Sequence, residues 1–132
     1  MGTCCSIGHP PCSQGAEKQS VSGSGRSVAG QLARDVAVRN AGAAGWGSLG
    51  VVIGATEPIT ASGIDPVLLQ HTPVLGPGFG YQGTRLATLS AVYGVAAASV
   101  IPTVTRSVLA AGPDGLEAAL DEHRAELEGQ TA

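Results

Sequence analysis

The sequence has few of the residues that usually build a large hydrophobic core or a charged binding surface. Aromatic residues make up 3% of the 132 residues and charged residues 13%. Large rings bury the most apolar area per residue, so a core without them is thin. The 7 basic residues are scattered, Lys18 is the only lysine, and the net charge is −3. Nucleic-acid binding needs a concentrated positive face, so this composition argues against a nucleic-acid partner.

The sequence also lacks a recognisable targeting signal and a set of cysteines spaced for disulfide bonds. No stretch resembles a secretory leader, and we expect a reducing, cytoplasmic setting. Cys4, Cys5 and Cys12 form an odd set with two adjacent members, which is a poor disulfide framework. Together with His9 they suggest zinc only weakly, because the usual Cys-x-x-Cys spacing is absent. We therefore expect no metal site.

Strand and helix patterns alternate along residues 25–132. Residues 1–24 are rich in Gly, Ser, Cys and Pro, which predicts an irregular or disordered lead. The apolar runs 49–56, 73–75 and 98–103 predict strands, and the continuous first run is typical of a strand buried on both faces of a parallel sheet. Helices are expected from a Ser27 cap to about residue 40, over 62–70, over 84–93, over 106–111 and from Pro113 onward. This order predicts an α/β fold built from βαβ units.

Apolar stripes predict which helix faces are buried. The first helix carries Val28, Leu32 and Val36 at i, i+4 spacing, and the last helix carries a stripe of leucines. Those leucines are Leu116, Leu120 and Leu127. His71 and His123 have no evident partner in the pattern, and we expect both to be exposed.

A membrane span is a rival interpretation of one segment. Residues 86–105 contain no charged side chain and are long enough to cross a bilayer. Gly94 and Pro102 interrupt this segment, and its alanine-rich part is only weakly apolar. We favour a helix followed by a buried strand, and we expect no membrane contact.

The most informative feature is a glycine-rich loop followed by a later arginine. The short strand that begins near Val74 runs into glycines between residues 76 and 83, and Arg106 follows the third strand. Glycines let backbone N–H groups approach an anion, and a guanidinium offers a fork of donors. The last two strands of a (β/α) barrel hold a phosphate in this way. The pattern predicts a site for a small phosphate ester.

Several segments together resemble orotidine 5′-phosphate decarboxylase, in the longer bacterial form common in actinobacteria. They are residues 15–19, 25–29, 50–56, 77–83 and 105–114. The likeness corresponds to the carboxyl-terminal half of the family's barrel. It implies a partial TIM (β/α)8 barrel with about the last three β/α units. A complete barrel needs about 250 residues, so 132 residues can form at most about half of one. It also implies conversion of orotidine 5′-monophosphate (OMP) to uridine 5′-monophosphate (UMP) and carbon dioxide in pyrimidine biosynthesis, with no cofactor, usually as a homodimer.

The resemblance implies roles for individual residues. Gln82 resembles a glutamine near the substrate phosphate, and Arg106 resembles the arginine that pairs with that phosphate. Thr56, at the carboxyl end of the first expected strand, is a further candidate for the pocket. A loop shapes this pocket in the family, and the segment that contains Pro77, Gly78 and Gly83 resembles it.

The family's catalytic set has no counterpart in the sequence. That set is a lysine with aspartates in an Asp-x-Lys-x-x-Asp pattern, whereas Lys18 follows Glu17 and precedes Gln19. We therefore assign no catalytic residue and expect a fragment that retains the phosphate-binding half and is inactive alone. Three alternatives stay open: a non-catalytic binder of a phosphate ligand, a half-barrel that assembles with a partner or with the missing half, and a fragment that does not fold stably.

Overall fold

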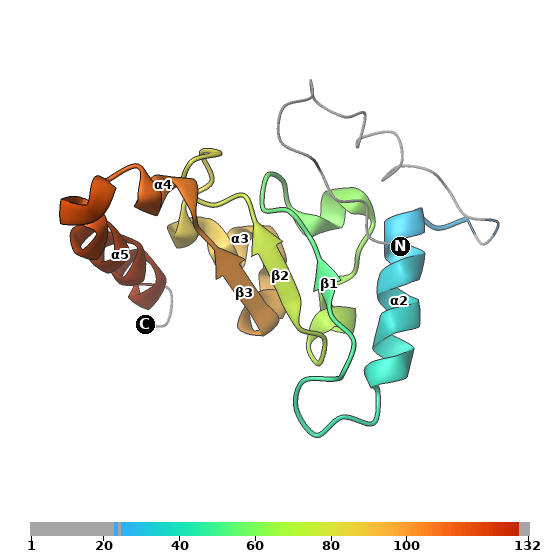
Figure 1. Cartoon of the computed structure of the whole chain (residues 1–132). Coiled ribbons are helices and arrows are strands. Elements are labelled where there is room, and N and C mark those ends of the chain that lie inside the picture. The colour runs from blue at the N-terminus through green and yellow to red at the C-terminus, as the bar shows by residue number, and fades with distance from the viewer. Residues whose placement is uncertain (1–22, 24, 130–132) are drawn as a thin grey trace.

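A parallel sheet forms the centre of the computed structural model, which describes residues 23 and 25–129. Its strands are β1 (Val51–Val52), β2 (Val74–Pro77) and β3 (Val100–Thr103). They lie side by side in chain order, all parallel (Figure 1). Parallel neighbours need crossover connections, and helical segments supply them here. The predicted α/β fold with parallel strands is confirmed.

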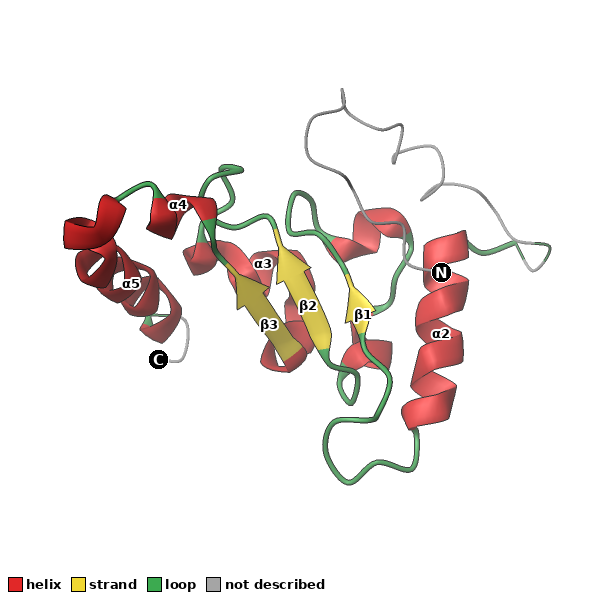
Figure 2. Cartoon of the chain, viewed as in Figure 1, coloured by secondary structure: helices red, strands yellow, loops and turns green. Residues whose placement is uncertain are grey.

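Helical segments lie behind the sheet and beyond both of its edges (Figure 2). α2 (Val28–Asn40) lies beyond β1, α3 (Leu89–Tyr93) lies behind the strands, and α5 (Gly112–Glu128) lies beyond β3. The helix expected over 62–70 is instead a short 3₁₀ helix over Pro66–Leu69, as suits a segment interrupted by Pro66. The helix expected over 84–93 begins with a 3₁₀ turn over Leu86–Thr88 and continues as α-helix. The helical elements are α2 (Val28–Asn40), η1 (Ile59–Ser62), η2 (Pro66–Leu69), η3 (Leu86–Thr88), α3 (Leu89–Tyr93), η4 (Gly94–Ser99), α4 (Arg106–Leu109) and α5 (Gly112–Glu128).

Some expectations fall outside the described residues, and others need correction. Almost all of the expected irregular lead, with Lys18 and the cysteines, lies outside them. The strand expected over 49–56 is assigned only to β1, although parallel pairing continues beyond it: the Ile53 N–H donates to the Leu75 carbonyl at 3.0 Å. Within the described residues, no helix is long and apolar enough to span a membrane.

The first helix begins where the sequence predicts. The Ser27 hydroxyl accepts a hydrogen bond from the Gly30 N–H at 3.0 Å and donates one to the Ser62 carbonyl at 2.6 Å. A side-chain oxygen at the N-cap satisfies a backbone donor that the helix itself cannot pair. The same serine therefore both starts α2 and attaches it to η1.

The predicted apolar stripe of α2 is partly wrong. Val36 is buried, but Val28 and Leu32 are 50% and 58% exposed. The helix instead turns its small residues inward, where Gly30 packs directly against the backbone carbonyl of Gly63. Close backbone packing fixes which face of α2 is buried, and a pattern of large apolar residues does not report it.

Asn40 ties the end of α2 to the sheet. Its side chain is 3% exposed and donates hydrogen bonds to the Leu49 carbonyl at 2.9 Å and the Thr72 hydroxyl at 3.1 Å. Its amide oxygen accepts from the Leu49 N–H at 3.3 Å. A buried amide must be hydrogen-bonded to be tolerated, and here its bonds join three segments.

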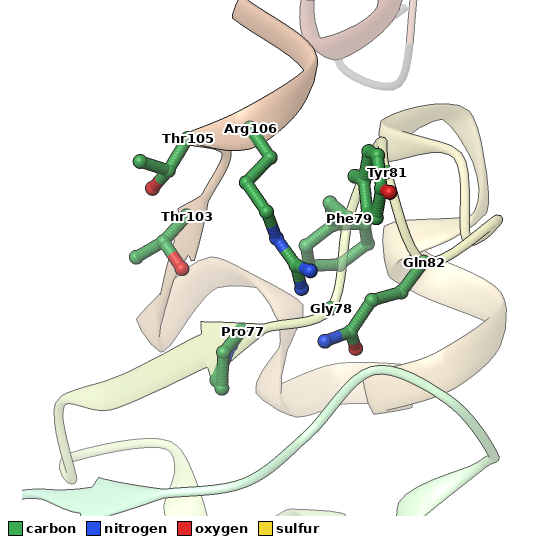
Figure 3. Close-up of a pocket in the computed structure, with 8 residues that line it drawn as sticks. All are labelled: Pro77, Gly78, Phe79, Tyr81, Gln82, Thr103, Thr105 and Arg106. Carbon is green, nitrogen blue, oxygen red and sulfur yellow. The ribbon is translucent and has the colours of Figure 1, made fainter. Parts of the chain in front are cut away.

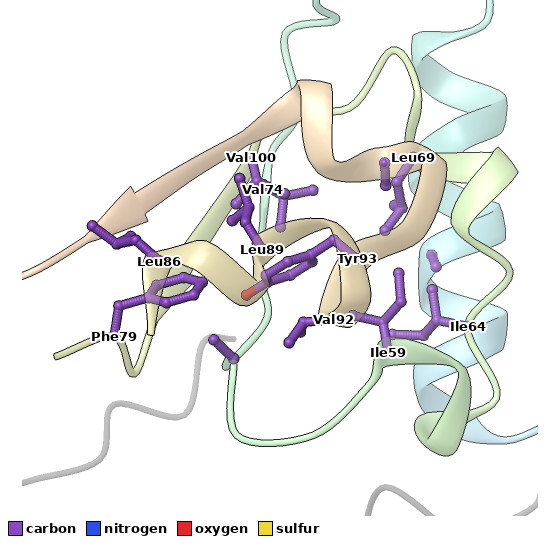
Figure 4. Packing of buried hydrophobic residues seen from close by; sticks show 13 residues of the cluster. Ile59, Ile64, Leu69, Val74, Phe79, Leu86, Leu89, Val92, Tyr93 and Val100 are labelled. Carbon is purple, nitrogen blue, oxygen red and sulfur yellow. The ribbon is translucent and has the colours of Figure 1, made fainter. Parts of the chain in front are cut away.

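The core lies between the sheet and the helical layer behind it (Figure 4). Tyr93 is its largest fully buried side chain, and its hydroxyl donates to the Ile53 carbonyl at 2.6 Å. The tyrosine passes over β2 because Gly76 has no side chain: a Cβ there would lie 2.8 Å from the Tyr93 hydroxyl. Around it pack Leu69, Val74, Leu86, Leu89, Val92 and Val100. Leu86, Leu89 and Val92 thus form the buried face of the segment expected to be helical over residues 84–93.

Glu126 attaches the last helix to the segment that contains Arg85 and Leu86. One carboxylate oxygen accepts from the Arg85 guanidinium at 2.8 Å, and the other accepts from the Leu86 N–H at 3.1 Å. The predicted leucine stripe is partly wrong, since Leu120 is 49% exposed and no residue of α5 is fully buried. Leu127 alone of that stripe packs against the core. Near its carboxyl-terminal end, α5 is therefore attached to the core and to the start of η3.

Candidate functional site

A pocket lies at the carboxyl ends of β2 and β3, where the chain leaves the sheet (Figure 3). Ligands in parallel α/β folds bind at this edge, because the loops that follow the strands converge there. Its volume is about 130 Å³. The lining residues are Pro77, Gly78, Phe79, Tyr81, Gln82, Thr103, Thr105 and Arg106.

Two of the predicted site residues face each other across this pocket. Arg106 begins α4, shortly after the end of β3 at Thr103, while Gln82 lies in the loop after β2. Figure 3 shows the guanidinium and the side-chain amide pointing into the same space. The two residues are 24 positions apart in the sequence, and the pairing of β2 with β3 brings them together.

The aromatic ring of Tyr81 holds the arginine in place. The central carbon of the Arg106 guanidinium lies 4.3 Å from the centre of that ring. A guanidinium over an aromatic face is attracted to the negative face of the ring, by roughly 0.5–1 kcal/mol at an exposed site. The contact leaves the edge of the guanidinium, which carries the N–H donors, free to face a ligand.

The turn after β2 depends on a glycine. Gly78 has φ +118°, a backbone conformation that other residues rarely adopt. A Cβ at this position would lie 3.3 Å from the Gln82 Oε1 atom. The glycine therefore permits both the turn and the approach of the amide. Pro77, which ends β2, lies in register with Thr103 of β3 on the other side of the pocket.

Two predicted residues do not line the pocket. Gly83 has φ +94°, and its N–H donates to the Gly80 carbonyl at 2.9 Å, so it shapes the turn. Thr56 is exposed and lies outside the lining. It follows Ala55, whose carbonyl accepts a hydrogen bond from the Thr84 hydroxyl at 3.1 Å.

Sequence reasoning missed four residues of the lining. Tyr81 and Phe79 lie in the glycine-rich loop, and Thr103 and Thr105 lie at and just after the end of β3. The position of the threonines could have been inferred, because residues at the carboxyl end of a parallel strand share an edge with those of its neighbour. The stacking of Tyr81 on Arg106 gives no signal in the sequence.

A contact between α4 and α5 supports the loop from behind. Ser107 Oγ lies 3.0 Å from His123 Nε2, and Gly80 packs directly against Ser107. Both histidines have partners, since His71 Nδ1 also lies 3.2 Å from the Gly45 carbonyl oxygen. The expected exposure is confirmed for His71 and is wrong for His123, which is partly buried. Because Ser107 follows Arg106, this contact fixes the start of α4 relative to the loop.

The charge of the lining favours an anion. Arg106 is the only charged residue among the lining residues, and no carboxylate is present there to neutralise it. Within the part of the chain that the structure describes, no group of three or more His, Cys, Asp or Glu residues could hold a metal ion. The arrangement can bind an anion through a guanidinium, an amide and threonine hydroxyls.

The parallel strands and the position of the pocket at their carboxyl ends define this structure as a parallel α/β protein. No protein-family model matches the chain. It is 43% identical over 99 residues to orotidine 5′-phosphate decarboxylase from Salinispora arenicola, an alignment that covers 74% of this chain and 34% of that protein. The same enzyme from Streptomyces coelicolor is 40% identical over 120 residues, covering 86% of this chain and 41% of the relative.

A solved structure agrees with these relatives. The crystal structure of an orotidine 5′-phosphate decarboxylase homologue from Streptomyces avermitilis matches with a TM-score of 0.78 and 36% identity. The match covers 92% of this chain and 42% of that chain. The chain is thus homologous to part of the actinobacterial orotidine 5′-phosphate decarboxylases. It spans less than half the length of each of these proteins.

Proposed function

We propose that this chain is the carboxyl-terminal, phosphate-binding part of an orotidine 5′-phosphate decarboxylase barrel and that it binds the phosphate of a pyrimidine nucleotide. The observation that carries the proposal is the shared pocket of Arg106 and Gln82 at the carboxyl ends of adjacent parallel strands. The homology to decarboxylases of OMP supports the choice of nucleotide. OMP and UMP both carry the phosphate that such a pocket would hold.

The size of the pocket matches one end of a nucleotide. Pockets that enclose a drug-sized ligand have volumes of roughly 300–1,000 Å³. The volume of about 130 Å³ found here is smaller, so it accommodates a terminal group and leaves the ribose and base outside. A guanidinium can donate two parallel hydrogen bonds to phosphate oxygens, and the Gln82 amide and Thr103 hydroxyl can donate others.

Binding and chemistry are separate in this proposal. Decarboxylation breaks the bond between the pyrimidine ring and its carboxyl group, and the vacated carbon must then receive a proton. In the family that the chain resembles, a lysine within an Asp-x-Lys-x-x-Asp pattern donates that proton. The 132 residues contain no such pattern. We therefore infer that the chain alone retains phosphate binding and does not decarboxylate OMP.

The binding part of the proposal is tested by titrating UMP into the chain and measuring heat or NMR shifts. Arg106→Ala removes charge-assisted hydrogen bonds and should weaken UMP binding by about tenfold to a hundredfold. Arg39→Ala is the matched control, because it removes an exposed arginine of α2 that does not line the pocket. Uridine, which lacks the phosphate, should not bind. Equal binding of uridine and UMP, or UMP binding that survives Arg106→Ala, would overturn the proposal.

The chemical part is tested by incubating the chain with OMP and following the absorbance of the pyrimidine ring. We expect no turnover above that in buffer. If turnover occurs and Lys18→Ala abolishes it, Lys18 is catalytic and our interpretation of its sequence context is wrong. Turnover that survives this substitution would also contradict the proposed separation of binding from chemistry.

A further inference from the structure

One face of the sheet is left uncovered by the described residues. Val52, Leu75 and Ile101 are 69%, 41% and 43% exposed. The strand register places Val52 opposite Leu75 and Leu75 opposite Ile101, so these residues form one apolar row across the sheet. Single exposed apolar residues are ordinary, whereas a contiguous apolar patch marks a place where something binds.

The two outer strands add unpaired backbone to this surface. β1 and β3 are the edges of the sheet within the described part of the chain. An edge strand presents N–H and C=O groups that can pair with another strand. Parallel sheets are almost always covered on both faces, because their connections place other elements there. We therefore look for one binding partner that would cover the apolar row and pair with both edge strands.

A second copy of this chain explains only part of this surface. Two sheets stacked face to face lie about 10 Å apart and cover each other's apolar side chains. Such stacking leaves the edges of both sheets unpaired. A segment with further parallel strands could pair with β1 on one side and with β3 on the other, which closes a barrel and buries the apolar row inside it.

The homologues indicate where such a segment exists. This chain matches 42% of the Streptomyces avermitilis protein, so the larger part of that protein lies outside the match. We propose that the apolar row and the edges of β1 and β3 bind a polypeptide that carries the remaining β/α units of the barrel. This chain then acts as one of two complementary parts. The inference rests on the sheet and the homology and does not require the phosphate site.

The experiment uses the segment of the Streptomyces avermitilis protein that this chain does not match. That segment carries an affinity tag and is expressed together with the full 132-residue chain. We expect the tagged segment to capture the chain and the pair to elute as a one-to-one complex. The tagged full-length homologue is the control, and we expect it to capture nothing because its own strands already occupy the equivalent surface.

Paired substitutions locate the contact. Val52→Lys places a charge in the apolar row and should reduce capture by about tenfold or more, because closing the barrel would bury that charge. Val38→Lys is the matched control, since Val38 on α2 is 70% exposed and Val52 is 69% exposed. Leu75→Lys repeats the test if Val52→Lys lowers the amount of folded chain, as judged by circular dichroism.

The remaining outcomes each have a defined meaning. Absence of capture, or capture that is unaffected by both Val52→Lys and Leu75→Lys, overturns the proposal. Equal capture by the full-length homologue overturns it as well, since this shows unspecific adhesion. A homodimer that Val52→Lys dissociates, with no capture of the segment, makes a second copy the occupant. Arg106→Ala should leave capture unchanged, so failure of the phosphate proposal can be distinguished from failure of this one.

Discussion

The two faces of the sheet differ sharply, although they are formed by alternate residues of the same strands. Val74 and Val100 on the covered face are 0% and 9% exposed, whereas Leu75 and Ile101, the next residue in each strand, are 41% and 43% exposed. All four residues are apolar. Strands with one solvated face normally alternate apolar and polar residues. These strands thus have the composition of a sheet with two buried faces, while the described residues bury one.

The candidate site is held by contacts among the described residues at the carboxyl ends of the strands. Tyr81 stacks on Arg106, and the contact between Ser107 and His123 supports the loop from behind. None of these residues belongs to the apolar row. Phosphate binding and barrel closure can therefore be measured separately.

The largest difference between the faces should appear when a large side chain is removed from each. Tyr93→Ala deletes the largest fully buried side chain and should destabilise the chain by about 3–5 kcal/mol. Leu75→Ala on the uncovered face should cost less than about 1 kcal/mol. Urea unfolding followed by circular dichroism measures both. Similar losses from the two substitutions would contradict the contrast between the faces.

A smaller difference is expected when a methyl group is added to each face. A Cβ at Gly76 would lie 2.8 Å from the Tyr93 hydroxyl and 3.0 Å from a methyl carbon of Val100. Gly76→Ala should therefore destabilise the chain by about 1–3 kcal/mol. Gly54, which alternates with the covered residues Ile53 and Ala55, has only one neighbouring atom, at 3.9 Å.

Gly54→Ala is the matched control for that substitution. We expect a change in unfolding free energy within about 0.5 kcal/mol. Urea midpoints of the two variants give the comparison directly. If Gly76→Ala is as stable as Gly54→Ala, the path of Tyr93 across β2 is not the reason for the glycine.

Local features of the fold could be predicted from the sequence. The Ser27 cap, the parallel direction of the strands and the buried positions of Leu86, Leu89 and Val92 each follow from residues close together in the chain. The positions of Arg106 and Gln82 at one pocket follow from the resemblance and from the rule that ligands bind at the carboxyl ends of parallel strands. The phosphate role of both residues remains a prediction.

Features that depend on distant contacts could not be predicted. Asn40 bonds to Thr72, which is 32 residues away, and nothing near either residue indicates the pair. Val28 and Leu32 fit an apolar stripe, yet close packing of Gly30 on Gly63 turns them outward. Periodicity reports where apolar residues lie on a helix, whereas backbone packing determines which side faces the sheet.

Alkaline pH should lower the free energy of unfolding through Tyr93, which is buried on the covered face. Burial raises the pKa of Tyr93 to about 12. Its unfolded-state pKa is about 10, so the folded chain holds this proton more tightly. The resulting stability is complete below pH 10 and is lost as pH rises toward 12, by about 1.4 kcal/mol per pH unit in that range.

Tyr93→Phe isolates this effect. The variant loses the hydrogen bond to the Ile53 carbonyl and should be less stable at neutral pH by about 1–2 kcal/mol. It should also lose the part of the alkaline destabilisation that Tyr93 causes. Urea midpoints measured between pH 8 and pH 11 test this. An unchanged slope in Tyr93→Phe would show that other groups cause the alkaline loss.

The smallest effect concerns the attachment of α5 to the covered side. The hydrogen bond from Arg85 lowers the pKa of Glu126, so the carboxylate contributes stability that is lost as pH falls through its folded-state pKa. Glu126→Gln removes the charge but retains an oxygen that can accept from the Leu86 N–H, and it should cost about 0.5–1 kcal/mol. Glu128→Gln, at an exposed ion pair with Arg124, should cost less because solvent already screens that pair. Equal losses at neutral pH would mean that Glu126 attaches the helix no more strongly than a surface ion pair does.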